Sequence, residues 1–476
     1  MNVAIVACRE QSDPGGRDAA GLTFVNELCA GPRKLASVAG ADRLVLVLHR
    51  NRYVLAQVQK HTREMGIDPV GVQIVHWDET QGGSHRLGVM LAGAAARAAV
   101  TVDATPQQVK PVLPVRLNRR ALLSMPRPVY SAVPEIDRDA CVAAEGCRAC
   151  AVECPKEAYA WSGGRIDYDK EACVSCGRCV TTCPAGAIAT PAISPSMVHA
   201  AIKAMVEAAS EPVGVAFMCS RRSESPPGPG WYPLEVPCAA MVPGTWPIAA
   251  LILGAGAARI VPCTAAGCSL AHDDVVTGNM DVARALLEAS GIEPELVPQS
   301  WRDVAKTPPF ATSTLVDPFG VEGAHETIVT LAALVEHEVR IEHHRSPTGI
   351  VEVNTSTCTM CMKCVSVCPA DALSQERDGD ELLLTFDAAR CTACGQCPSV
   401  CPEVARGAIE CHQRIDSTAI SAGPTTLNRA TAARCEICGE AIAPAPMMER
   451  IASLLGNEHP ATMGYLIRRC VNCRGS

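Results

Sequence analysis

The chain has 476 residues, a formal net charge of −8 and 27 cysteines, whereas aromatic residues make up only 3% of it. An acidic chain without a basic stripe argues against a nucleic-acid partner or an anionic membrane surface, and the length predicts about three or more domains. Most of the cysteines stand in C-x-x-C runs that are too tight for disulfide pairs, so we expect metal or cluster ligands in a reducing cytoplasm. No signal-peptide pattern follows Met1, and the best candidate for a membrane span, residues 246–258, is shorter than the about 20 residues that a span needs.

Residues 1–105 are predicted to form an α/β domain. The apolar runs 2–7, 43–48 and 71–75 are typical of buried parallel strands, and residues 53–65 and 86–99 have helical length and spacing. The domain contains Cys8 and Cys29, each just after an apolar run, and a lone buried cysteine usually serves packing.

The order of these pieces resembles the N-terminal domain of the flavin-containing subunit of heterodisulfide reductase. The places that match the family's cysteine motifs read V-A-C-R at Cys8, L-C-A-G at Cys29 and V-L-H-R-N-R at His49. The family has a later cysteine that falls near residues 78–84, where this chain has none, so metal binding by Cys8, Cys29 and His49 stays open. The family's flavin domain has no counterpart, because residues 100–133 have the composition of a linker and no G-x-G-x-x-G follows a strand.

Residues 134–192 are predicted to be a ferredoxin module with two [4Fe–4S] clusters. The run C-V-S-C-G-R-C-V-T-T-C-P from Cys173 has the spacing of a cluster-binding loop, in which a side chain at Gly177 could crowd the cluster. In the first half, three residues are inserted after Cys141, so a [3Fe–4S] cluster is the alternative there. By the exchange of ligands between the halves of such repeats, the sets are Cys141, Cys147, Cys150 and Cys183, and Cys154, Cys173, Cys176 and Cys179.

Residues 211–306 alternate strand-like and helix-like runs, and four cysteines fall at or just beyond the predicted strand ends: Cys219, Cys238, Cys263 and Cys268. Open parallel sheets build binding sites at that edge, although the spacing alone fits packing as well. The sequence motifs V-A-F-M-C, V-P-C and V-P-C-T-A-A-G-C resemble those of the delta subunit of methyl-viologen-reducing hydrogenase. In that family the delta subunit delivers electrons to the flavin-containing subunit of heterodisulfide reductase. The resemblance implies a thioredoxin-like domain with one [2Fe–2S] cluster, although Arg222 stands where that family has a further cysteine.

Residues 307–346 are predicted to be a helical spacer, and residues 349–412 a second ferredoxin module that repeats residues 141–184. Two strict runs, C-T-M-C-M-K-C-V-S-V-C-P and C-T-A-C-G-Q-C-P-S-V-C-P, begin at Cys358 and Cys391. The predicted ligand sets are Cys358, Cys361, Cys364 and Cys401 for one [4Fe–4S] cluster, and Cys368, Cys391, Cys394 and Cys397 for the other. Cys411 stands alone in the sequence, and we expect it to serve packing.

Residues 430–476 form a tail with two C-x-x-C pairs, made by Cys435, Cys438, Cys470 and Cys473. Two such pairs suit a tetrahedral, zinc-ribbon-like site that holds a structural zinc. A rubredoxin-like iron is the alternative occupant.

These assignments predict an α+β multidomain protein: an N-terminal α/β domain, two ferredoxin-like modules, a central thioredoxin-like α/β domain and a small Cys₄ tail. A cluster held by four cysteines offers no open iron position, so no catalytic residue is assigned. The order of units resembles the flavin-containing subunit of heterodisulfide reductase, without its flavin domain, fused to the hydrogenase delta subunit. We therefore expect an electron-transfer subunit of a cytoplasmic oxidoreductase complex of the heterodisulfide reductase, hydrogenase or formate dehydrogenase kind. Four [4Fe–4S] clusters and one [2Fe–2S] cluster would relay single electrons to or from partners that hold flavin, molybdenum or nickel–iron.

Two other functions remain open. A catalytic disulfide or thiol reductase could use Cys8, Cys29 and His49, although no Cys-Cys pair occurs in the chain. A redox-sensing or nucleic-acid-binding protein could use the Cys₄ tail, which is flanked by Arg468, Arg469 and Arg474.

Overall fold

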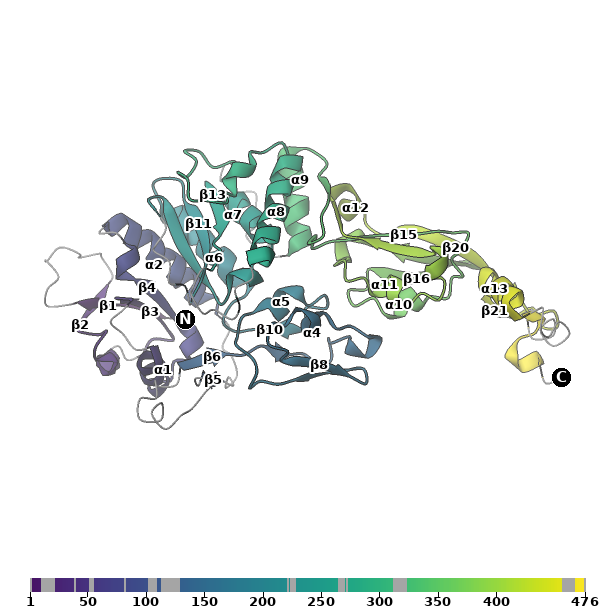
Figure 1. Ribbon diagram of the computed structural model, residues 1–476, viewed down its shortest axis with the longest axis horizontal. Coiled ribbons are helices and arrows are strands. Elements are labelled where there is room, and N and C mark those ends of the chain that lie inside the picture. Colours follow the sequence, from purple (N-terminus) through teal and green to yellow (C-terminus); the bar gives the residue numbers. More distant parts are fainter. Residues whose placement is uncertain are drawn as a thin grey trace. The chain divides into compact units, whose positions relative to one another are not determined.

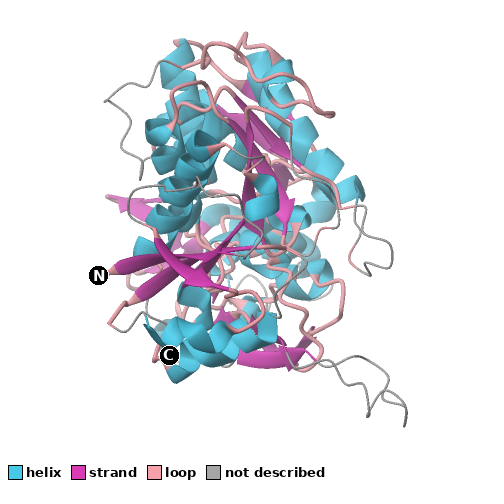
Figure 2. Cartoon of the chain, turned by 90° about the vertical axis from the view of Figure 1, so that its left-hand side faces the viewer, coloured by secondary structure: helices cyan, strands magenta, loops and turns pink. Residues whose placement is uncertain are grey.

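The computed structural model describes residues 2–9, 22–37, 40–50, 55–80, 83–101, 109–112, 129–220, 222, 228–263, 270, 273–310, 323–455 and 467–474. It divides into two compact units, each of which is described by itself. The first comprises residues 1–140, 149–162 and 166–335, and the second comprises residues 141–148, 163–165 and 336–476. Helices and strands occur in both units (Figure 1), and Figure 2 distinguishes the two kinds of element by colour.

The first unit begins with a parallel four-stranded sheet in the order β2-β1-β3-β4. Its elements are β1 (Val3–Arg9), β2 (Thr23–Asn26), β3 (Arg43–Leu48), α1 (Leu55–Glu64), β4 (Val72–His76) and α2 (Ser84–Ala99). Every residue of β3 is buried, because this strand lies between β1 and β4. The sequence predicts these elements except β2, whose four residues form too short a run to stand out.

The segment 100–133, predicted to be a linker, contains structure. Within it β5 (Val109–Val112) and β6 (Val129–Ala132) pair antiparallel. Paired strands form hydrogen bonds between their backbone N–H and C=O groups. These residues therefore form regular structure and do not serve only as a linker between domains.

The first ferredoxin module follows. Its elements are β7 (Glu135–Ile136), α4 (Ala149–Glu153), β8 (Tyr159–Ser162), β9 (Arg165–Tyr168), α5 (Arg178–Thr182) and β10 (Ile188–Ala189). β7 and β10 pair antiparallel and bring the two ends of the module together. Arg178 of α5 forms an ion pair with Glu153 at the end of α4, which joins the two cysteine-bearing helices. The module is followed by α6 (Pro195–Ala208), which lies along α2 (Figure 1).

The central domain contains a parallel sheet in the order β12-β11-β13. Its elements are β11 (Gly214–Cys219), β12 (Trp231–Val236), α7 (Thr245–Ile252), β13 (Ala257–Ile260), α8 (Asp273–Ala289) and α9 (Ala324–Val335). All strands of this sheet among the described residues are parallel, as an open α/β domain requires. A thioredoxin-like arrangement would add antiparallel strands, so that name stays a prediction.

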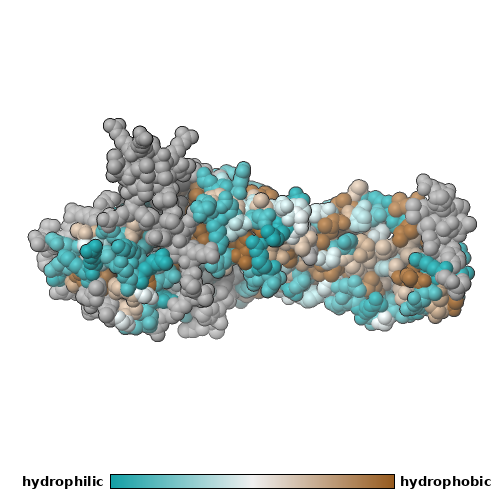
Figure 3. Space-filling view, turned by 90° about the horizontal axis from the view of Figure 1, so that it is seen from below, coloured by the Kyte–Doolittle hydropathy of each residue, from teal (hydrophilic) through white to brown (hydrophobic). Residues whose placement is uncertain are grey.

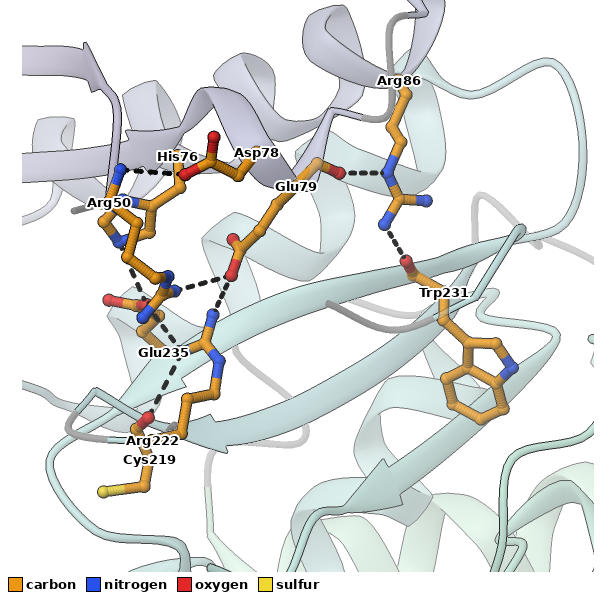
Figure 4. A network of polar contacts seen from close by, with 9 residues as sticks. All are labelled: Arg50, His76, Asp78, Glu79, Arg86, Cys219, Arg222, Trp231 and Glu235. Atoms are coloured by element: carbon orange, nitrogen blue, oxygen red, sulfur yellow. Dashed lines mark hydrogen bonds and ion pairs between the residues drawn. The ribbon is translucent and has the colours of Figure 1, made fainter. Parts of the chain in front are cut away.

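A network of ion pairs and hydrogen bonds connects the central domain to the N-terminal sheet (Figure 4). Arg222 pairs with Glu79, just after β4, and with Glu235 of β12 at 2.7 Å. Arg86 of α2 donates hydrogen bonds of 2.6 Å to the backbone oxygens of Glu79 and Trp231. Burial alone would raise the pKa of Glu235, but the contact with His76 Nε2 at 3.7 Å and the charge of Arg222 outweigh it and lower that pKa to about 2.

The second unit contains the second ferredoxin module and the tail. Its elements are β14 (Arg340–Glu342), β15 (Ile350–Val353), α10 (Lys363–Ser366), β16 (Leu373–Asp378), β17 (Glu381–Phe386), α11 (Gln396–Ser399), β18 (Ile409–His412), β19 (Arg414–Asp416), α12 (Ser417–Ser421), β20 (Thr425–Arg434), β21 (Ala441–Pro444) and α13 (Ala445–Leu455). β15 pairs with β18, as β7 pairs with β10 in the first module. The long strand β20 adds to the hairpin β16–β17 and continues into the tail through β21. The predicted spacer also contributes a strand, since β14 pairs with β19.

The hydropathy of the surface and of the helices can be compared with what a membrane protein requires. On the face drawn in Figure 3, hydrophobic residues lie in small groups among hydrophilic ones. Within the described residues, no helix combines the length and the apolar character that crossing a bilayer demands.

Candidate metal centres

Three of the cysteine loops share an unusual backbone conformation. The residues on either side of the middle cysteine are left-handed: Ser175 and Gly177 have φ 54° and 81°, Met360 and Met362 have φ 55° and 59°, and Ala393 and Gly395 have φ 54° and 69°. A left-handed conformation costs a non-glycine residue about 1–2 kcal/mol, so its recurrence at matching places indicates a common demand. Alternating conformations of this kind turn successive N–H groups towards one concavity, which suits an anionic group such as a cluster with its thiolates.

In the first module, Cys154, Cys173, Cys176 and Cys179 line one cavity. The backbone N–H of Ser175 donates to Cys173 Sγ at 3.4 Å, and the N–H of Ala158 donates to Cys154 Sγ at 3.3 Å. The hydroxyl of Tyr159 donates to Cys179 Sγ at 3.3 Å. These four cysteines are one of the sets that the sequence predicts, and Tyr159 is a contact that the spacing of cysteines does not reveal.

Burial acts strongly on these thiols. It raises the pKa of Cys179 to about 12, and the charges of neighbouring cysteines add to the effect although Tyr159 opposes it. Burial also raises the pKa of Cys176. A coordinated metal deprotonates a thiol outright. Bound iron would therefore keep these cysteines as thiolates, although burial alone favours the protonated thiols.

In the second module, Cys368, Cys391, Cys394 and Cys397 line a corresponding cavity. The N–H of Ala372 donates to Cys368 Sγ at 3.2 Å, at the place that Ala158 has in the first module. Cys411 of β18 lines the same cavity. The pairing of β18 with β15 thus brings Cys411 to the other cysteines from outside the motif, and its expected role in packing stays a prediction.

The other two predicted sets differ from each other. In one of them, burial and the charges of Cys358, Cys361 and Cys401 raise the pKa of Cys364 to about 12. The remaining set is Cys141, Cys147, Cys150 and Cys183, whose first loop contains the insertion. Its loop keeps one left-handed residue, Gly146 with φ 94°, and among the described residues it lacks the second, because Arg148 follows Cys147 without a positive φ. The insertion after Cys141 thus changes the loop.

Three cysteines of the central domain lie at the carboxyl ends of adjacent parallel strands. Cys219 ends β11, Cys238 follows β12, and Cys263 follows β13. Cys219 and Cys238 are buried, and Cys268 lies outside the described residues. Arg222 donates a hydrogen bond of 3.2 Å to the backbone oxygen of Cys219 and belongs to the network of Figure 4.

This edge of the central sheet touches the first module. The short helix η5 (Ala239–Met241) begins directly after Cys238 and packs on α5, which carries Cys179. A Cβ atom added at Gly177 would lie 2.7 Å from Met241 Sδ. The structure gives two reasons for glycine at this position, its left-handed φ and the closeness of Met241. The expectation that a side chain there would crowd a cluster stays a prediction.

In the tail, the sulfur atoms of Cys435, Cys438, Cys470 and Cys473 all lie within 4.8 Å of one another. Cys438 Sγ and Cys470 Sγ are 3.6 Å apart, close to the about 3.8 Å edge of a tetrahedron with Zn–S bonds of about 2.3 Å. Backbone hydrogen bonds from Cys470 and Cys438 lower the pKa of Cys435 to about 6. The donor set and its compactness fit a single tetrahedral metal ion.

A second compact group lies in the N-terminal sheet. The ligand atoms of Cys8, Cys29 and His49 also lie within 4.8 Å of one another, with Cys29 Sγ and His49 Nδ1 at 3.5 Å. The N–H of Cys29 donates to Cys8 Sγ at 3.2 Å, and the N–H of His49 donates to Cys29 Sγ at 3.3 Å. In a cluster each ligand binds a different iron, so a group this compact suits one metal ion better than a cluster.

Comparison with known protein families gives two matches. Residues 357–406 match the family described as 4Fe-4S dicluster domain, and residues 165–188 match the family described as 4Fe-4S binding domain. A search of curated proteins found no match. The chain therefore contains two 4Fe–4S ferredoxin-type domains, which supports an iron–sulfur electron-transfer role. Neither match extends into residues 1–105, 211–306 or 430–476.

Proposed function

We propose that this chain is an electron-transfer subunit of an oxidoreductase complex, with four [4Fe–4S] clusters in its two ferredoxin modules. The observation that carries the proposal is the repeated loop: left-handed residues beside the middle cysteine, backbone N–H groups aimed at Sγ atoms, and four cysteines around a cavity. The insertion after Cys141 leaves a [3Fe–4S] cluster as the alternative in the first loop.

Such a centre, when bound, accepts and releases one electron at a time and leaves no iron position free for a substrate. The chain itself holds the thiolates, excludes water and adjusts the potential. Tyr159 and the loop N–H groups donate hydrogen bonds to the ligand sulfurs, and such bonds stabilise the more negative reduced state.

The central domain extends the proposed relay. Cys219, Cys238, Cys263 and Cys268 would hold a [2Fe–2S] cluster, in keeping with the resemblance to the hydrogenase delta subunit. Contact between η5 and α5 supports electron exchange with the first module, because η5 adjoins Cys238 and α5 carries Cys179. Partners that hold flavin, molybdenum or nickel–iron in the cytoplasm would supply and accept the electrons.

One observation favours a second candidate function. The compact group of Cys8, Cys29 and His49 leaves a tetrahedral metal with one position for an outside ligand, which a thiol or disulfide reductase could use. The nucleic-acid alternative has no such support, since Arg468 pairs with Glu436 at 3.2 Å.

The test is the content of iron, zinc and acid-labile sulfide per chain after anaerobic purification, with EPR spectra after dithionite reduction. Four [4Fe–4S] clusters and one [2Fe–2S] cluster require about eighteen irons. We expect C176A and C394A each to lose about four irons and one [4Fe–4S] signal. A chain without iron, or one that binds flavin and reduces an organic substrate with NAD(P)H on its own, contradicts the proposal.

A further inference from the structure

The second ferredoxin module has five cysteines around one of its cavities, whereas a [4Fe–4S] cluster needs four. Cys411 is held there by the sheet, since β18 pairs with β15 and sets Cys411 opposite Val351. Cys411 lines this cavity together with Cys391 and Cys397. It therefore lies beside two of the proposed ligands.

A second observation places Cys411 at the cluster-binding loop. The strand β18, which carries Cys411, packs on α11, which begins directly after Gly395 and carries Cys397. Gly395 is one of the left-handed residues whose N–H groups serve the concavity of the loop. Cys411 thus lies against the backbone feature that suits thiolate ligands.

The internal repeat supplies a comparison. Ile409 pairs with Val353 in the second module, and Ile188 pairs with Ile136 in the first, so Cys411 corresponds to Thr190. Thr190 accepts a hydrogen bond of 3.4 Å from the N–H of Ala192, and it is not among the described residues that line the first cavity. The fifth sulfur is therefore a property of the second module.

We propose that Cys411 is a reserve ligand, able to replace Cys391 at the cluster of Cys368, Cys391, Cys394 and Cys397. The inference rests on the proposed function, because it presumes a [4Fe–4S] cluster in this cavity. In the exchange, Cys411 releases its proton to water and its thiolate bonds to the iron that Cys391 has left. The displaced Cys391 thiolate takes up a proton, so the oxidation state and the number of irons stay the same.

The experiment compares three variants of the full chain, prepared anaerobically: C391A, C391A/C411A and C173A. Cys173 holds the position in the first module that Cys391 holds in the second, with Thr190 in place of Cys411, so C173A is the matched control. We expect C391A to keep the iron content of the wild type, with a shifted EPR signal for that cluster. C391A/C411A and C173A should each lose about four irons per chain and one [4Fe–4S] signal.

Two outcomes overturn the inference. Loss of iron from C391A equal to that from C391A/C411A shows that Cys411 does not replace Cys391, and full iron in C391A/C411A shows that three ligands suffice without Cys411. In each sample the signals of the module without a substitution report whether the chain has folded. A wild-type chain without [4Fe–4S] signals would refute the proposed function instead, so the two failures are distinguishable.

Discussion

Arg222 and Glu79 form an ion pair whose side chains are only 1% and 3% exposed, and it joins the central domain to the N-terminal sheet. Glu79 has a second cation in Arg50, whose guanidinium lies 2.6 Å away and is 25% exposed. The proposed resemblance to the hydrogenase delta subunit would place a cysteine at Arg222. In this chain Arg222 joins two domains.

Replacing Arg222 by alanine should destabilise the first unit. Removing one partner of a buried pair costs about 3–5 kcal/mol, and the remaining Arg50 puts the expected loss at about 3 kcal/mol. Urea unfolding followed by circular dichroism measures it. K60A is the control, because its partner Glu64 and Lys60 itself are both more than half exposed and such pairs contribute less than about 1 kcal/mol. Equal losses in the two variants would contradict a buried role for Arg222.

Gly177 and Gly395 provide a matched pair of substitutions. Both are left-handed, so alanine costs each about 1–2 kcal/mol in backbone conformation, but only at Gly177 does the added Cβ meet Met241. We expect G177A to be the more damaging variant, with partial loss of the first module's [4Fe–4S] signals, and G395A to keep its cluster. Adding the M241A substitution to G177A should restore the cluster. If it does not, the cluster is lost because of the backbone conformation at residue 177 and not because of the contact with Met241.

The hydroxyl of Tyr159 should influence the potential of the cluster held by Cys179. A hydrogen bond is worth about 1 kcal/mol, which for one electron corresponds to about 40 mV. The variant Y159F should lower the potential by that amount, because the reduced state loses its donor. Redox titration followed by EPR measures it. The second module has Leu373 at the same distance from its own cysteine motif, so its potentials serve as the internal reference.

Removal of the metal ion from the Cys₄ site of the tail should not affect the iron–sulfur clusters. We expect C438S to release one zinc ion per chain without loss of iron, because all four tail cysteines surround a site of their own. Metal analysis of the variant checks this, and exchange of the bound ion for cobalt gives a tetrahedral thiolate spectrum. Loss of iron instead of zinc would establish the rubredoxin-like alternative.

The group of Cys8, Cys29 and His49 should bind one metal ion. A tetrahedral site with sulfur and nitrogen ligands has an edge of about 3.6 Å, and Cys29 Sγ lies 3.5 Å from His49 Nδ1. The double variant C8S/C29S should therefore contain one zinc fewer than the wild type and the same iron. An unchanged zinc content would show that Cys8 and Cys29 bind no zinc and serve only the hydrophobic core, in which both are packed.

Much of this architecture could be predicted from the sequence, because its signals are local. Apolar runs predict strands such as β3, and spacing within a dozen residues predicts the sets around Cys173, Cys358 and Cys391. What could not be predicted depends on residues far apart in the chain. Arg222 meets Glu79 across 143 positions, and Cys411 reaches its cavity only through the pairing of β15 with β18.

The same limit applies to β20. This strand joins the hairpin β16–β17 although residues 425–434 show no run of apolar residues. Non-local pairing of this kind has no short-range pattern, so the boundary predicted between the second ferredoxin module and the tail remains a prediction.

The left-handed residues bear on the fate of the chain when iron is scarce. In the second module Met360, Met362 and Ala393 each hold a conformation that costs about 1–2 kcal/mol, whereas the corresponding loops of the first module contain one such non-glycine residue, Ser175. Without a cluster to offset it, this strain favours local opening and cleavage by proteases. The abundance of the protein in a cell would then follow the supply of iron, and the carboxyl-terminal half would be degraded first.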